Sequence, residues 1–139
     1  MFAAIRSKID ATLAAIPEIK QYSSSPKTKI SNYPYVFYFP SGFENSYETN
    51  QENLKVYRFQ MFAIVGTKQT TEASASDVLA GVVDAIITKF DEDWNQGLID
   101  NHRVWMTMDS GDSWEMSEEQ DGLEIYAPLS LEFRLLTDV

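Results

Sequence analysis

The chain of 139 residues contains no cysteine and a single histidine, His102. Disulfide bonds, thiolate nucleophiles and thiolate metal sites are therefore excluded. A serine–histidine–acid triad would need His102 beside an activated serine, and no G-x-S-x-G turn is present to hold one. The phosphate-binding patterns G-x-x-x-x-G-K-[ST] and G-x-G-x-x-G are missing as well. We expect no cofactor and no enzymatic activity.

Basic residues are scarce: the chain has 11 Lys and Arg but 21 Asp and Glu, which gives a formal net charge of −10. Residues 1–30 carry five bases and two acids, whereas residues 31–139 carry six bases and nineteen acids. Such an acidic body repels nucleic acid, which fits a surface that DNA passes without specific binding. The alternative explanation of the acidity is good solubility.

Long apolar runs are absent too, and none approaches the roughly 20 residues that a membrane-spanning helix needs. We therefore expect no membrane contact. Arg6, Lys8 and Asp10 interrupt the first sixteen residues, so no secretory leader is expected and the default location is the cytoplasm. Apolar residues make up 44% of the chain, enough for one core, and the length fits one domain, residues 1–139.

Hydrophobic periodicity predicts two helices, over residues 2–16 and 77–90. Alternating apolar and polar residues predict strands over residues 33–39, 54–65, 103–108, 113–116 and 123–136. This order favours an α+β domain: a mostly antiparallel sheet, with two amphipathic helices packed on one face.

The last predicted strand, residues 123–136, is unusually long and has one apolar face. At about 3.4 Å per residue it would run roughly 46 Å, against 17–20 Å for a common strand. We expect it either to bend at Pro128 or to pair its free edge with a neighbouring subunit.

The polar segment 43–53 separates the first two strands and is longer than a hairpin turn needs. We interpret it as a projecting polar hairpin arm or a flexible loop with a binding role. Our candidates for a subunit or partner interface lie on this segment and on the strands beside it: Phe43, Glu44, Tyr47, Glu48, Lys55, Arg58, Glu132 and Arg134.

Acidic residues follow one another without a base near the end of the chain, and we expect them in polar turns. The candidate acidic surface, which would face basic partners or passing DNA, comprises Asp109, Asp112, Glu115, Glu118 and Glu119. A less favoured alternative is a small carboxylate-dependent hydrolase that stacks sugars on Trp105 and Trp114.

A metal site is not expected. Asp91, Asp93 and Asn95 match the first ligand spacings of an EF-hand, but Gln96 and His102 replace the glycine and the glutamate that the loop requires.

The order of elements resembles that of the tail terminator (tail completion) proteins of long-tailed bacteriophages. The resemblance rests on the aromatic strand YPYVFYF at residues 33–39, the polar arm, the strand LKVYRFQMF at residues 54–62, the helix at 77–90 and the long last strand. It spans nearly the whole chain but contains no signature motif, so no individual residue role is transferred from the family.

The resemblance implies a non-catalytic virion protein at the tail–neck junction, assembled in the host cytoplasm. Such proteins form a ring, usually a hexamer, on the tail-tube protein and meet the head–tail connector protein, while the genome passes through the middle. Alternatives are another neck or tail-tube component, or a monomeric binding module that uses the loop 44–53.

Overall fold

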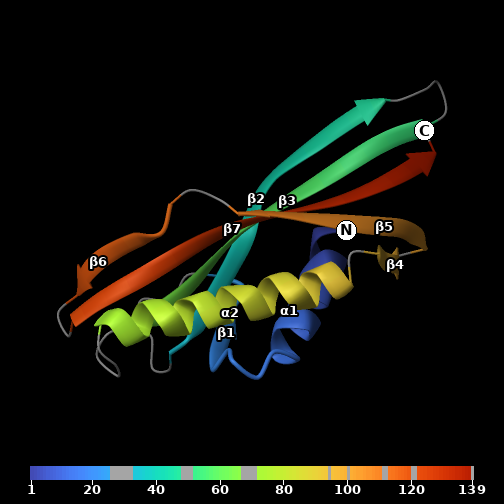
Figure 1. Ribbon diagram of the computed structural model, residues 1–139. Coiled ribbons are helices and arrows are strands. Elements are labelled where there is room, and N and C mark those ends of the chain that lie inside the picture. Colours follow the sequence, from blue (N-terminus) through green and yellow to red (C-terminus); the bar gives the residue numbers. More distant parts are fainter. Residues whose placement is uncertain are drawn as a thin grey trace.

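The computed structural model of the chain describes residues 1–25, 33–47, 52–66, 72–93, 95–99, 101–110, 113–119 and 122–138. In chain order the elements are α1 (Phe2–Ala14), β1 (Gln21–Ser23), β2 (Tyr35–Tyr47), β3 (Glu52–Gly66), α2 (Glu72–Glu92), β4 (Asn95–Ile99), β5 (His102–Ser110), β6 (Glu115–Glu119) and β7 (Gly122–Asp138). The fold is α+β, as predicted, and both helices lie on one side of the sheet (Figure 1). None of the helices described is long and apolar enough to cross a membrane.

The core fills the space between the helices and one face of the sheet, here called the helix face. Alternate residues of β3 and β7 point to that face, and on β7 those from Ile125 to Leu135 are at most 3% exposed. The apolar stripes of the helices pack against them through Ile5, Ile9 and Leu13 of α1 and Leu79, Val82, Ile86 and Phe90 of α2. Each large apolar side chain buried in this way contributes roughly 1.5–3 kcal/mol.

The long strand β7 lies in the middle of the sheet, and this corrects the expectation that it pairs a free edge with a neighbour. The strand order is β1-β2-β3-β7-β5-β4, with β6 also paired to β7. β3 follows β7 from Asp138 to Glu124, while β5 and β6 together occupy most of its other edge. Segments of the same chain therefore supply the strand partners that we expected from another subunit.

Pro128 falls at a break in the strand pairing along one edge of β7, the edge opposite β3. On that side, β5 reaches as far as Leu129 and β6 begins opposite Tyr126. Pro128 lies between these two paired stretches, where its missing N–H takes no hydrogen bond from β5 or β6, and it is in register with Phe62 on the β3 side.

Two short strands are not predicted by the sequence. Gln21–Ser23 pair in parallel with β2, which makes the sheet mixed. After α2, β4 pairs with β5 around an irregularity near Gly97, whose φ is 66°. Both strands lie at sheet edges and lack the apolar alternation by which strands are recognised.

Several elements are also longer than predicted: α2 starts at Glu72, β2 runs on to Tyr47, and β5 and β6 extend to Ser110 and Glu119. Backbone pairing continues in these strands beyond the covering helices, where neither face needs apolar side chains. Hydrophobic patterning therefore predicts the covered part of each strand and misses the rest.

The described residues of the predicted segment 43–53 are strand rather than flexible loop. β2 and β3 form a hairpin whose register pairs Tyr47 with Asn53, and the end of β7 runs beside it. Figure 1 shows this three-stranded ribbon projecting beyond the helices. We call residues 42–47, 52–57 and 133–138 the arm; the predicted segment 43–53 is its tip, of which residues 48–51 lie outside the described part.

Candidate subunit and partner interface

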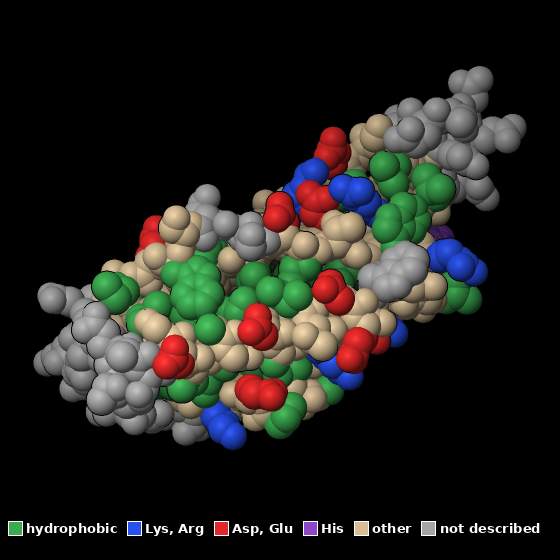
Figure 2. All heavy atoms as spheres, in the orientation of Figure 1, with side chains coloured by type: hydrophobic (Ala, Val, Ile, Leu, Met, Phe, Trp, Pro, Cys, Tyr) green, Lys and Arg blue, Asp and Glu red, His purple; other side chains and the backbone are tan. Residues whose placement is uncertain are grey.

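Four of the predicted interface residues meet on the face of the sheet that is turned away from the helices, here called the open face. Arg58 of β3 donates hydrogen bonds to Glu44 of β2 at 2.6 Å and to Glu132 of β7 at 3.0 Å. Arg134 donates to the other oxygen of Glu132 at 2.7 Å. This ion network joins three strands at the root of the arm, where Figure 2 shows acidic and basic side chains gathered together.

The electrostatics of the ion network are those of a half-exposed surface. Hydrogen bonds from Arg134, and to a smaller extent from Arg58, lower the pKa of the Glu132 carboxyl. The pKa of the Arg58 guanidinium is raised by the hydrogen bonds that it donates to Glu44 and Glu132. The four side chains are 28–55% exposed, so each pair is worth at most about 1 kcal/mol. The network therefore fixes side-chain positions more than it stabilises the fold.

A cavity of about 460 Å³, here called the root pocket, opens beside the ion network. Its polar lining comes from neighbouring strands: Ser41, Arg58, Thr107, Asp109, Ser130, Glu132 and Arg134. Register places Asp109 opposite Ser130, and Ser130 opposite Gln60. Gln60 is held in this row, because its Nε2 donates to the Leu129 carbonyl at 3.2 Å.

The other predicted interface residues do not join the ion network. Phe43 points to the helix face, where its ring lies 5.0 Å from that of Tyr57. The register shift between Pro40 and Gly42 adds one residue to β2 and thereby exchanges the faces of all residues beyond it. Lys55 is paired with Leu135, Tyr47 is placed only by its backbone pairing, and Glu48 lies outside the described residues.

The described residues of the candidate acidic surface lie on strands, which corrects the expectation of polar turns. Asp109 lies next to the last residue of β5, and Glu115 is the first residue of β6, paired with Tyr126. Glu118 and Glu119 continue β6, and Asp112 lies outside the described residues. No three His, Asp or Glu side chains in the described part are grouped closely enough to hold a metal ion.

Sequence reasoning did not identify an aromatic patch on the open face, made of Phe37, Phe39, Phe62 and Pro128. The Phe37 and Phe62 rings stack at 5.2 Å between centroids, and Phe39 lies 6.3 Å from each of them. The alternation of residues 33–39 placed Phe37 and Phe39 on one face. It does not say which face the helices cover, because both faces of β2 carry aromatic residues.

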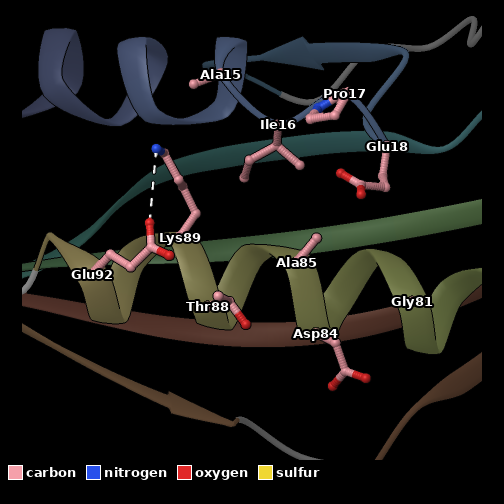
Figure 3. A pocket seen from close by; sticks show the side chains of 10 residues that line it. All are labelled: Ala15, Ile16, Pro17, Glu18, Gly81, Asp84, Ala85, Thr88, Lys89 and Glu92. Atoms are coloured by element: carbon pink, nitrogen blue, oxygen red, sulfur yellow. Dashed lines mark ion pairs between the residues drawn. The ribbon is translucent and has the colours of Figure 1, made fainter.

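A second cavity, of about 400 Å³, lies between α2 and the turn that follows α1 (Figure 3). Ile16 points across it toward α2, while Asp84 points away from it. Lys89 lies 4.0 Å from Glu92 within α2. Half of the lining residues are small or aliphatic, and the other half are polar: Glu18, Asp84, Thr88, Lys89 and Glu92. Lys89 is already paired with Glu92 and Asp84 points away, so the groove favours no particular ligand.

No family model and no curated protein matches this chain. A solved structure described as "Virion of native gene transfer agent (GTA) particle" contains a similar chain, at 18% identity and a TM-score of 0.49, covering 98% of this chain and 91% of that one. A second solved chain, without a functional name, is similar at 12% identity and a TM-score of 0.46, covering 97% and 95%. Neither likeness assigns a function or a residue role to this protein.

Proposed function

We propose that this protein is a structural component of a phage-like virion, and that it closes into a ring on the end of the tail tube beside the head–tail connector. The resemblance in the order of elements supports this proposal. The second support is the arm, which offers backbone hydrogen-bonding groups and apolar side chains to a neighbouring subunit.

The observation that carries the proposal is the outer edge of β2. β1 pairs only with Tyr35–Phe37, and no other described strand lies along the remainder of that edge. Pro40 cannot donate a hydrogen bond, so an incoming strand would pair beyond it, with residues 42–47. Phe43 is 48% exposed on this stretch. Unpaired edges of this kind are templates for a further strand unless something covers them.

The other outermost strand, β4, is the best-suited partner for this edge in a second copy. β4 (Asn95–Ile99) carries no charge, and its Leu98 is 67% exposed. β6 also borders the sheet, but it carries three acids, which would repel Glu44 of an incoming arm. Pairing β2 of one copy with β4 of the next repeats a single head-to-tail contact, and such contacts close into rings when the rotation allows it.

The proposal is tested by placing a charge on each edge. Phe43→Asp and Leu98→Asp should each abolish the ring seen by electron microscopy and sedimentation while leaving the circular dichroism spectrum unchanged. An equimolar mixture of the two variants should form dimers only, because each variant keeps one intact edge. Val78→Asp is the control, since Val78 is exposed to a similar extent on α2.

A wild-type protein that stays monomeric at its highest soluble concentration and does not bind purified tail-tube subunits would overturn this function. A ring that survives both edge substitutions would retain the assembly role and reject the proposed edges.

A further inference from the structure

The open face carries a second surface with the chemistry of a binding site, separate from the strand edges proposed for ring closure. It combines the root pocket with the aromatic patch. Register arranges its side chains in rows across the sheet: Phe39, Gln60, Ser130 and Asp109 form one row. Phe37, Phe62 and Pro128 form the next, about 7 Å away along the strands.

Charge defines what the pocket can accept. Within the described structure both guanidinium groups that line it, Arg58 and Arg134, are paired with carboxylates. Asp109 also lines the pocket, is exposed, and has no ion pair or hydrogen bond from its side chain in that part of the chain. The charge left unmatched is therefore negative, and it suits an incoming cation.

Arg134, which lines the pocket, carries a hydrogen-bond donor that no described group uses. Nε of Arg134 is buried and has no acceptor among the described residues. A buried donor without a partner costs about 1–3 kcal/mol, and a ligand carbonyl would recover this once the Arg134 side chain, which is 40% exposed, turns its Nε toward the pocket. Arg134 lies four residues along β7 from Ser130, roughly 13 Å, so a ligand that reaches both it and Asp109 must be several residues long.

The aromatic patch supplies the apolar half of the site. Phe37, Phe39 and Phe62 are only partly buried, although their rings stack on one another. No lysine or arginine occupies these two rows. An apolar side chain laid on the rings would bury more of their surface, at about 25 cal/mol per Å².

We propose that this face binds an extended segment of a partner protein in which a lysine or arginine is followed, two positions later, by an aromatic or aliphatic residue. In an extended segment, side chains two residues apart point the same way and lie about 7 Å apart, which matches the spacing of the two rows. The basic side chain pairs with Asp109, the apolar one covers Phe62, and a backbone carbonyl accepts from Arg134. The ring and this site use different surfaces, so either proposal can fail alone.

The test uses the full chain and the probe peptide acetyl-Gly-Gly-Gly-Gly-Lys-Gly-Phe-amide, with binding followed by NMR. Amide signals of β3, β5 and β7 around the root pocket should shift. Replacing the peptide lysine or its phenylalanine by alanine should weaken binding about tenfold, and Asp109→Asn should do the same. Glu115→Gln is the matched control, because Glu115 is an exposed acid on the same face but does not line the pocket.

Equal loss of binding in Asp109→Asn and Glu115→Gln would overturn the site, since it would show attraction to acidity in general. Absence of shifts on the open face would overturn it as well. If Asp109→Asn instead dissociates an oligomer of the chain itself, the occupant is a second copy and the assignment to a partner protein is wrong.

Discussion

Two glycines of this protein differ in how much space surrounds the position where a side-chain Cβ would lie. A Cβ on Gly66 would lie 2.9 Å from two ring atoms of Tyr33, whereas one on Gly81 of α2 would meet nothing within 4 Å. The Tyr33 ring is held in place, because its hydroxyl donates to Glu124 at 2.9 Å.

Gly66→Ala should therefore destabilise the fold by about 1–3 kcal/mol through overpacking. Gly81→Ala should stabilise it by up to about 1 kcal/mol, because alanine restricts the unfolded chain and favours the helix. Urea unfolding of both variants beside the wild type measures the difference. Similar effects from the two substitutions would contradict the placement of Tyr33 against β3.

At the same scale, the sequence indicated polar residues at the arm but not their partners. Glu44, Arg58, Glu132 and Arg134 were selected as interface candidates, and they meet in one ion network. Their pairing depends on the register of strands that are 74 residues apart in sequence, which no local pattern specifies. Phe43 was assigned to the same interface, but a single-residue bulge in β2 turns it to the opposite face.

Among the elements, β7 shows how far hydrophobic patterning can be used. Its alternation correctly predicted one buried face, but not that strands of the same chain would pair along one whole edge and most of the other. Those edges are satisfied by segments distant in sequence, and pairing of that kind leaves no periodic signal. β1 and β4 were missed for the related reason that short edge strands do not need alternating apolar residues.

The two ends of β7 should respond differently to the same substitution. Leu131 is fully buried between the sheet and the helices, whereas Leu136 on the arm is 46% exposed. Leu131→Ala should cost about 2–5 kcal/mol of unfolding free energy, because it leaves a cavity in the core. Leu136→Ala should change stability by less than about 0.5 kcal/mol. Chemical denaturation followed by tryptophan fluorescence measures both, and equal losses would mean that the arm is covered in the isolated chain.

The whole molecule combines a compact body with a projecting arm. Its net charge opposes the association of one copy with another. Every copy carries a formal net charge of −10, so neighbours in a ring repel one another. At 0.01 M salt the screening length is about 30 Å, so the repulsion extends across a subunit. At 0.15 M salt the screening length is about 8 Å, so only nearby charges repel. Assembly through neutral edges such as β4 limits this repulsion without removing it.

Raising the salt concentration should therefore strengthen self-association of this protein, the reverse of what basic nucleic-acid-binding proteins do. Sedimentation velocity at low and physiological ionic strength should show a shift toward the ring, and fluorescence anisotropy should detect no binding of duplex DNA at either. Phe43→Ser is the control, since it removes an apolar contact of the arm without changing charge, and salt should not restore its assembly fully. Association that weakens as salt rises would instead mean that attraction between the basic first thirty residues and the acidic remainder holds the subunits together.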